Sequence, residues 1–379
     1  MDYIRKQNID WILVGALIPI LVMGLVTLHS FSAESSVMYR QLIWVVFSLM
    51  VFFGCSFLDF RFLKNTKLLV GLFIFGNLLL FALFIFSTAI KGSTRWLDFG
   101  FFSIQPVDIM KVILSLILAK YFSRRHIEIK QIKHIFISGV YMFIPFIMVF
   151  FQPDFGSALV LFSIWFGMVL ISGISKKHLA IILTGAVLVF LGLWFFVFAP
   201  YQRARVISFV QPLQDIQGTG YNAYQSMITV GSGQLLGKGV GYGTQSRLNF
   251  LPEYQTDFIF AAFAEEWGFV GSALLLILYA VIIWRILHTA MYADGNFASF
   301  FAMGIAFFLM AHIVINIGMN IGVMPVTGLP LPFMSRGGSH IFVELFALGI
   351  IMSMRRFNRS IHKNDLDNEF VGIGDSILK

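Results

Sequence analysis

The stretch from Leu251 to Gly271 reads LPEYQTDFIFAAFAEEWGFVG. It begins where a polar, glycine-rich segment ends, and it continues into a strongly apolar run of helical length. An aspartate, Asp257, lies at this junction, and Glu265 and Glu266 follow two turns further along. Acidic residues at the mouth of an apolar helix are costly in a membrane, so they are functional candidates.

The composition of the whole chain places this junction in a membrane protein. The chain has 379 residues, of which 58% are hydrophobic and 12% charged, and its mean hydropathy is +0.84. A soluble domain is usually about a quarter charged. A membrane span needs roughly 20 apolar residues, and about ten candidate spans can be read from the sequence. They are residues 10–30, 39–58, 67–90, 107–122, 134–151, 155–173, 178–199, 257–286, 297–322 and 338–356. We therefore predict an all-α polytopic membrane protein.

The basic residues predict its orientation. One set of connections carries most of them: Arg5, Lys6, Arg61, Lys64, Lys67, Arg124, Arg125, Lys130, Lys133, Lys176, Lys177, Arg355, Arg356 and Arg359. The positive-inside rule makes this set cytoplasmic, with both termini. One large extracellular loop, residues 200–256, then joins the seventh and eighth spans, with short helices expected near 203–210 and 220–231. We expect a single membrane domain over residues 1–357 and a disordered cytoplasmic tail over residues 358–379.

Two classes of ligand are disfavoured by the sequence. Residues 231–239, GSGQLLGKG, resemble a phosphate-binding loop. A P-loop, however, needs glycine where Ser232 stands and Ser or Thr where Gly239 stands. The net charge of +8 is not accompanied by the interleaved basic and aromatic residues that stack nucleic-acid bases. We therefore expect no nucleotide cofactor and no nucleic-acid partner.

The fourth predicted span opens with a candidate charge pair. Residues 105–111 read QPVDIMK, so Asp108 and Lys111 are three apart, share a helix face and can pair. Lys111 lies about one turn inside an apolar helix and needs a carboxylate partner, for which Asp108 and Asp257 are both candidates. The structural alternative is an acid favoured by the helix dipole and balanced by a lysine.

Two further candidates occur in short outer loops. Asp154 lies in QPDFG (152–156) and either serves a site or only caps the sixth span. Arg95 lies in KGSTRW (91–96), where it and Lys91 are candidate phosphate contacts.

The connection between the last two spans is a further candidate. Residues 327–339 read TGLPLPFMSRGGS, and their prolines and glycines predict ordered, non-helical backbone at the outer boundary. Such backbone persists at membrane depth only where protein packs around it or where it lines a wet cavity. Ser335 and Ser339 can donate hydrogen bonds to an anion. His340 and Glu344 follow four residues apart, but two ligands do not make a metal site, and the remaining histidines are expected at the interface or in the cytoplasm.

The acids of residues 251–271 differ in what they can do. Asp257 either serves a site or, with Thr256, caps the eighth span. Glu265 and Glu266 are expected about 12 Å deeper, from the rise of a helix. They point to different faces, and Glu266 is expected to be a structural partner for a polar group inside the bundle.

Taken together, these motifs resemble the SEDS family (shape, elongation, division and sporulation proteins), and most closely its RodA-type branch. The matching stretches are RWLDFG (95–100), QPVDIMK (105–111), QPDFG (152–156), GYNAYQSMITVGSGQLLGKG (220–239), LPEYQTDFIFAAFAEEWGFVG (251–271) and TGLPLPFMSRGGS (327–339). They occur in family order across nearly the whole chain. Two positions depart from the family pattern, since Asp108 replaces a glutamate and Arg336 replaces a tyrosine.

The resemblance implies a peptidoglycan glycosyltransferase of the bacterial cytoplasmic membrane. Such enzymes act in cell elongation, polymerise lipid II at the outer face, release undecaprenyl pyrophosphate and work with a class B penicillin-binding protein. The family's essential aspartate falls on Asp257, its fourth-span acid and lysine on Asp108 and Lys111, and an arginine on Arg40.

Glycosyl transfer from a lipid pyrophosphate needs a base, cationic help for the leaving group and a groove for the lipid. Asp257 is the candidate base, with Lys111 and Asp108 as catalytic partners. The candidate pyrophosphate cations are Arg40, Arg95, Lys238, Arg247 and Arg336, with Ser335 and Ser339 as further substrate contacts. A divalent ion, Mg²⁺ or Mn²⁺, is an open option with no metal ligand assigned. Two alternatives stay open: a flippase for the lipid-linked precursor, and a non-catalytic membrane scaffold for a penicillin-binding protein.

Overall fold

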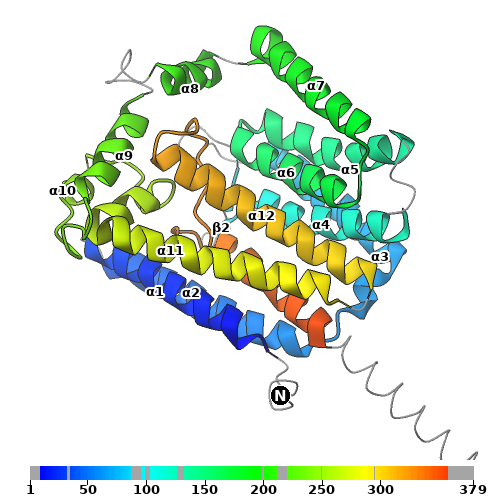
Figure 1. The fold of residues 1–379 in the computed structure, drawn as a ribbon, viewed down its shortest axis with the longest axis horizontal. Coiled ribbons are helices and arrows are strands. Elements are labelled where there is room, and N and C mark those ends of the chain that lie inside the picture. The colour runs from blue at the N-terminus through cyan, green and yellow to red at the C-terminus, as the bar shows by residue number, and fades with distance from the viewer. Residues whose placement is uncertain are drawn as a thin grey trace, which may run out of the picture.

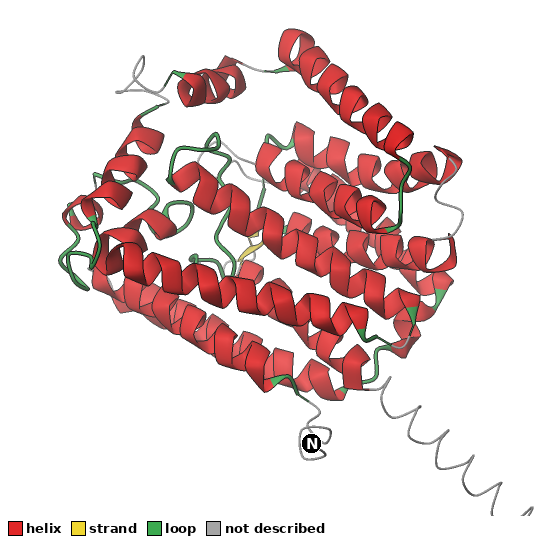
Figure 2. Ribbon diagram, viewed as in Figure 1, coloured by secondary structure: helices red, strands yellow, loops and turns green. Residues whose placement is uncertain are grey.

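The computed structural model describes residues 9–31, 35–86, 95–98, 103–125, 132–198, 200–211, 220–248, 250–293 and 295–356. This part of the chain is almost entirely helical (Figures 1 and 2). The helices are α1 (Trp11–Phe31), α2 (Ser35–Phe57), α3 (Thr66–Phe86), α4 (Pro106–Arg125), α5 (Ile132–Phe151), α6 (Phe155–Ile171), α7 (Lys176–Gly192), α8 (Pro200–Val210), α9 (Tyr221–Ser232), α10 (Thr244–Arg247), α11 (Ile259–Met291) and α12 (Asn296–Asn320). A last helix, Gly338–Arg356, follows α12. The predicted tail, residues 358–379, lies outside the described residues.

The predicted spans all coincide with helices, which confirms the all-α polytopic class. In the described residues, 8 helices are long and apolar enough to cross a membrane. The two predicted spans outside that group are α6, which has 17 residues, and α4, which carries Asp108 and Lys111. The number of crossings beyond these 8 stays a prediction. A short antiparallel pair, β1 (Leu97–Asp98) with β2 (Ser103–Ile104), was not predicted.

Helix α12 lies at the centre of the bundle, where it packs against α4, α6 and α11 (Figure 1). Helix α1 packs on α11 and α2, whereas α5 packs on α6 and α3. Helix α7 stands apart from this bundle: it continues into a π-helical turn, Leu193–Val197, and none of its residues is buried. The short helices predicted in the outer connection appear as α8 and α9.

Helix α11 is broken near its outer end, and the outer connection fills the break. Gly268 has φ 65° and ψ −164°, which interrupts the helical path. The N–H groups of Phe269 and Val270 donate to the carbonyls of Gln234 and Leu235 at 2.9 and 3.1 Å. In return, the N–H groups of Lys238 and Gly239 donate to the carbonyls of Glu265 and Glu266 at 2.9 and 3.0 Å. Irregular backbone is tolerated at membrane depth when protein satisfies its polar groups, as residues 234–239 do here.

The Glu265 carboxylate anchors the same connection. One oxygen accepts from Lys238 Nζ at 2.8 Å, Gln245 N at 3.0 Å and Thr244 Oγ1 at 3.2 Å. The other oxygen accepts from Ser246 N at 3.3 Å and Ser246 Oγ at 3.2 Å. Glu266 also binds this connection, since its Oε1 accepts from Gly241 N at 2.6 Å. Its second polar partner is the side chain of Ser30 on α1, which agrees with the structural role expected for Glu266.

The opposite end of the molecule is closed by a buried ion cluster. Asp10 accepts hydrogen bonds from Arg285 Nε and Nη2 at 2.8 and 2.7 Å, and Arg355 contacts the same oxygen. Burial raises the pKa of Asp10, but the bond from Arg285 and the charges of Arg355 and Arg285 outweigh it and leave the pKa below its ordinary value of 3.8. The start of α1, the end of α11 and the end of the last helix therefore meet at one face.

Candidate functional site

Asp257 lies in the turn that leads into α11, and its side chain is half-buried. The helix begins at Ile259 with Phe258 as its N-cap residue, and no side chain caps it at that position. Whether Asp257 caps the helix or serves a site stays a prediction. Its carboxylate lies beside Gly328, where an added Cβ would be 3.4 Å from Asp257 Oδ2 and 3.8 Å from Arg95 Nη1. Asp257 and Arg95 thus flank the same point.

A buried charge network lies near the outer ends of α4, α12 and the last helix. Lys111 Nζ is 2.8 Å from Asp108 Oδ1, and both side chains are 1% exposed. His340 faces two carboxylates, since Nε2 is 2.8 Å from Glu344 Oε1 and Nδ1 is 3.5 Å from Asp108 Oδ2. Of the two partners expected for Lys111, the structure therefore supplies Asp108.

The charge state of this network follows from its geometry. Asp108 and Glu344 contribute two anions, whereas Lys111 contributes one cation. Isolated charges are very costly in an apolar interior, so such groups are paired or neutralised. An imidazolium carries hydrogen on both nitrogens and therefore complements the charge of a carboxylate on each side, although neither nitrogen of His340 makes a hydrogen bond in the described structure. With His340 in that form the network is electrically neutral.

Two of the predicted cations lie at the Asp257 junction. Arg95 is the first. Arg336 is exposed, and its Nη1 donates to Gln255 Oε1 at 2.6 Å, two residues before Asp257. Arg40 is exposed on α2, whose Gln41 donates to Ser335 O at 3.2 Å, and the predicted contact of Arg40 with the substrate stays a prediction.

The other two predicted cations lie on the outer connection. Lys238 is paired with Glu265 at 2.8 Å, and Arg247 is exposed at the end of α10. The structure therefore gives Lys238 a role in holding the connection, and the predicted contact of either residue with pyrophosphate stays a prediction.

The two predicted serines differ in their surroundings. Ser335 Oγ donates to Thr256 O at 2.6 Å and accepts from Leu331 N at 2.7 Å, so it holds the two site segments together. Ser339 Oγ is buried and has no hydrogen-bond partner in the described structure. It lines an otherwise apolar groove between α2, α4 and the last helix. The groove residues are Trp44, Phe47, Ile104, Ile109, Ser339, Phe342 and Val343.

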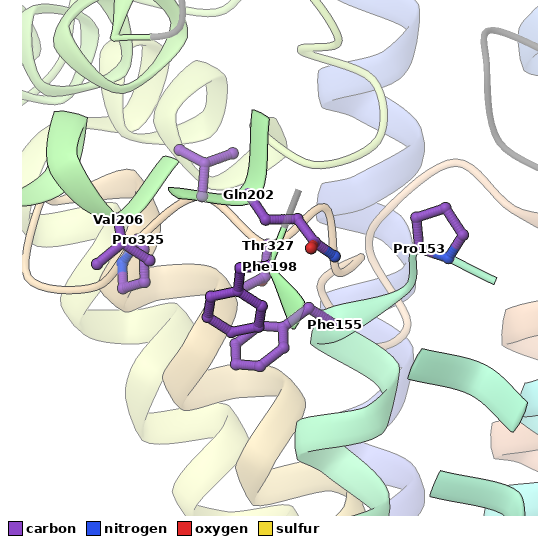
Figure 3. A pocket seen from close by; sticks show the side chains of 8 residues that line it. Pro153, Phe155, Phe198, Gln202, Val206, Pro325 and Thr327 are labelled. Carbon is purple, nitrogen blue, oxygen red and sulfur yellow. The ribbon is translucent and has the colours of Figure 1, made fainter. Parts of the chain in front are cut away.

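Asp154 performs the capping role that was one of its two alternatives. Its carboxylate accepts from Ser157 N at 3.1 Å at the start of α6. It also lies 3.8 Å from Arg95 Nη1 and accepts from Gln105 Nε2 at 3.2 Å, while Arg95 Nη2 donates to Pro153 O. A small, mostly apolar pocket opens next to this turn (Figure 3). Its lining residues are Pro153, Phe155, Phe198, Gln202, Val206, Pro325, Val326 and Thr327.

Three residues of α12 escaped the sequence reasoning. His312, Asn316 and Asn320 are all fully buried at 0% exposure, and each bonds to a segment of the site. The expectation that the remaining histidines lie at the interface or in the cytoplasm is wrong for His312. Its ring is buried inside the bundle, where its polar partners are Lys111 Nζ and the carbonyl oxygen of Pro330. The available signal was the four-residue spacing of polar side chains within an apolar helix.

The site supplies few ligands for a metal ion. In the part of the chain that the structure describes, no group of three or more His, Cys, Asp or Glu side chains could hold one. Mg²⁺ is commonly bound through one or two protein carboxylates together with substrate phosphates. A divalent ion would fit this site only in that way, with Asp257 as a single carboxylate ligand.

The fold and site define a class: a multi-pass helical membrane protein with a half-buried carboxylate and a neutralised charge network at one face. A family model described as "Cell cycle protein" and named for FtsW, RodA and SpoVE matches residues 6–360. The chain belongs to this family, the SEDS proteins.

Named relatives and solved structures support this assignment. Peptidoglycan glycosyltransferase MrdB of Escherichia coli K12 is 39% identical over 295 residues, which are 77% of this chain and 79% of that protein. Stage V sporulation protein E of Bacillus subtilis 168 is 32% identical over 365 residues, 94% of this chain and 99% of that protein. The crystal structure of Thermus thermophilus RodA has a TM-score of 0.67 at 27% identity and covers 92% of this chain and 97% of its own. A chain of a peptidoglycan synthase complex, described for its coordination of polymerization and crosslinking, has a TM-score of 0.80 at 30% identity, covering 92% and 98%.

Proposed function

We propose that this protein is a peptidoglycan glycosyltransferase that polymerises lipid II at the outer face of the bacterial cytoplasmic membrane during cell elongation, and releases undecaprenyl pyrophosphate. The observation that carries the proposal is the junction at Asp257. A half-buried carboxylate lies there, and it flanks Gly328 together with Arg95. The buried pair Lys111–Asp108 supplies opposite charges in the same bundle. The activity of the relatives supports the proposal. So does the position of Asp257, Arg95 and Arg336 together at one face of the bundle.

In the proposed reaction, Asp257 accepts the proton of the acceptor hydroxyl while the oxygen of that hydroxyl attacks the anomeric carbon of the donor sugar. The bond from that carbon to the pyrophosphate breaks, so the leaving group carries away the electron pair and configuration inverts. Preorganised cations that face developing charge lower the barrier to such a step. Arg95 and Arg336 are candidates for this role because they lie at the junction. Arg40 is a third candidate because α2 is bonded to the 327–339 segment through Gln41.

The lipid chain needs an apolar surface beside the reacting groups. The groove that contains Trp44, Phe47 and Phe342 is suited to an isoprenoid tail. Ser339 also lines the groove, but its Oγ is buried, and the contact of this hydroxyl with the substrate stays a prediction. A divalent ion bound by Asp257 and the pyrophosphate is compatible with this arrangement. The proposed partner for cross-linking is a class B penicillin-binding protein, and the relationship to a chain of a synthase complex supports it.

The test uses purified protein in lipid nanodiscs with labelled lipid II, alone and with a class B penicillin-binding protein. Wild-type protein is expected to form glycan polymer, and Asp257→Asn is expected to lose at least about 10²-fold in rate, the usual contribution of a general base. Glu253→Gln, a change of exposed carboxylate four residues earlier, is the matched control. Full activity of Asp257→Asn would refute the assignment of the base.

A flippase is separated from an enzyme in the same preparation. Protein in liposomes is given labelled lipid II, and the label in the outer leaflet is quenched chemically. Translocation without polymer would support the transporter instead. Polymer that forms only when the partner is present, at the same rate with Asp257→Asn as with wild-type protein, would support the scaffold.

A further inference from the structure

Helix α12 carries a row of polar residues that the proposed reaction does not use directly. His312, Asn316 and Asn320 are four residues apart, so they lie on one face of the helix. All three side chains are 0% exposed, and the helix around them is strongly apolar, with a mean hydropathy of 2.2. Buried polar groups are costly unless they are hydrogen-bonded, so their partners show what these residues are for.

Asn316 joins the two backbone segments that flank the candidate base. Its Nδ2 donates to Asp257 O at 2.9 Å and to Leu329 O at 2.7 Å. Carbonyl oxygens only accept, which fixes the orientation of the amide and uses both of its hydrogens. One side chain therefore holds the turn before α11 against the segment that contains Gly328.

Asn320 lies one helical turn after Asn316 and binds the same segment before α11. Its Nδ2 donates to Asp257 O at 3.1 Å, and its Oδ1 accepts from Ala261 N at 3.1 Å. The first N–H groups of a helix have no partner within it, so Asn320 supplies from α12 a cap that α11 lacks in its own sequence. The Asp257 carbonyl is thus bonded by two amides from one neighbouring helix.

His312 connects this row to the buried charges. Its Nε2 is 3.1 Å from Lys111 Nζ, and an ammonium group only donates, so Nε2 is the acceptor. The ring hydrogen is then on Nδ1, which lies 3.2 Å from Pro330 O. A neutral His312 therefore links the Lys111–Asp108 pair to the main chain of Pro330.

We propose that His312, Asn316 and Asn320 form a positioning row that sets the location of Asp257 relative to Lys111 and the 328–330 backbone. This inference rests on the proposed function, in which Asp257 is the base. The three residues do not touch the reacting atoms. They act through the main chain of Asp257, which two amides bind, and through the Pro330 carbonyl, which fixes the neighbouring loop.

The expected effect is on turnover rather than on substrate affinity. Small displacements of a reacting group, of about 1 Å, can cost on the order of 10²-fold in rate. Asn316→Ala removes both donors and is expected to lower kcat about 10²-fold, with KM for lipid II changed by less than about threefold. Loss of kcat and kcat/KM together is the signature of a group that acts in the transition state.

The matched control is Asn77→Ala. Asn77 lies on α3, and its Nδ2 donates to the carbonyl of Phe73 at 2.7 Å in its own helix. The substitution removes the same amide from another apolar helix without touching the site, so it is expected to keep wild-type kcat.

Hydrogen exchange of the same variants tests the inference without activity. Asn316→Ala is expected to increase exchange in residues 255–261 and 328–331, and Asn77→Ala is expected to leave both segments at wild-type protection. If wild-type protein makes no glycan, the proposed function fails while this measurement still decides whether the row holds the Asp257 turn. Wild-type exchange in both segments of Asn316→Ala would overturn the inference. So would a kcat within about threefold of the Asn77→Ala control.

An isosteric variant covers the case in which Asn316→Ala does not fold. Asn316→Asp keeps the shape of the side chain, and its carboxyl group can donate one hydrogen bond only when protonated. Its kcat is expected to fall as the pH rises, relative to wild type, because ionisation removes the last donor. A pH profile parallel to that of wild-type protein would count against the positioning role.

Discussion

The anchoring of the outer connection by Glu265 leads to a sharp prediction for Glu265→Gln. The Glu265 side chain is 0% exposed and accepts hydrogen bonds from the backbone N–H groups of Gln245 and Ser246 as well as from Lys238 Nζ. A glutamine amide keeps one accepting oxygen, so its NH₂ group faces donors and leaves at least one of the two backbone N–H groups unsatisfied. An unsatisfied buried donor costs about 1–3 kcal/mol, and loss of the ionic partner of Lys238 adds to this.

The measurement is hydrogen exchange of residues 238–248 in nanodiscs. A loss of about 2 kcal/mol in the local free energy of opening corresponds to roughly 30-fold faster exchange, since 1.4 kcal/mol is a factor of ten. Trypsin cleavage after Arg247 is expected to accelerate in parallel, because this residue is already exposed.

The adjacent residue provides the matched control. Glu266 Oε1 accepts from Gly241 N, while Oε2 has no hydrogen-bond partner in the described structure. Glu266→Gln keeps an oxygen that can accept from Gly241 N, and the other partner of Glu266, Ser30, lies on α1 outside the measured segment. Exchange of residues 238–248 is therefore expected to change less than about threefold. Equal acceleration in the two variants, or none in Glu265→Gln, would refute the reasoning.

Three other perturbations have expected outcomes. Gly268→Ala is expected to lower Tm markedly in a thermal melt. Backbone with φ 65° and ψ −164° is essentially restricted to glycine and costs other residues about 1–3 kcal/mol, and the added Cβ would overlap the backbone of Gly237. An unchanged Tm would contradict the break in α11. Asp10→Asn is expected to cost about 3–5 kcal/mol by leaving Arg285 without its buried partner. The depressed pKa of Asp10 means that its contribution is complete above pH 3.8 and is lost as the pH falls through the lower folded-state value, so acid should lower the Tm of wild type more than that of Asp10→Asn. Asp108→Glu adds a methylene to a site that is 1% exposed and is expected to cost about 1–3 kcal/mol in chemical denaturation, despite retaining the charge that pairs with Lys111; a stabilised variant would show that the pocket has room.

The sequence predicted the 8 membrane-length helices of the described residues well because each is a continuous apolar run. Apolar composition also explains what was missed at Gly268, since hydropathy stays high on both sides of the break. The break is visible only when residues 234–239 are seen to complete its hydrogen bonds, and that pairing is a long-range property. The two-residue strands β1 and β2 are too short to give an alternating pattern.

The positions of the candidate site residues could be predicted from single residues and their spacing, whereas their contacts could not. The roles of these residues stay predictions. Asp257 could be located from its place at a helix mouth, and Asp108 and Lys111 from their spacing. The capping of α11 by Asn320 could not be read locally, because the two residues that bond are 59 positions apart. Lys238 shows the same limit: its charge was visible, whereas its pairing with Glu265 depends on how the outer connection folds.

Helix α7 has a consequence for how this protein is handled. None of its residues is buried, although the helix and its π-helical extension are among the most apolar segments of the chain, with a mean hydropathy of 2.6. Protein packing therefore contributes little to its position, and the surrounding hydrocarbon must hold it instead. The bilayer is in that sense part of the tertiary structure. Changing acyl-chain length or substituting detergent should alter α7 before it alters α4 or α12.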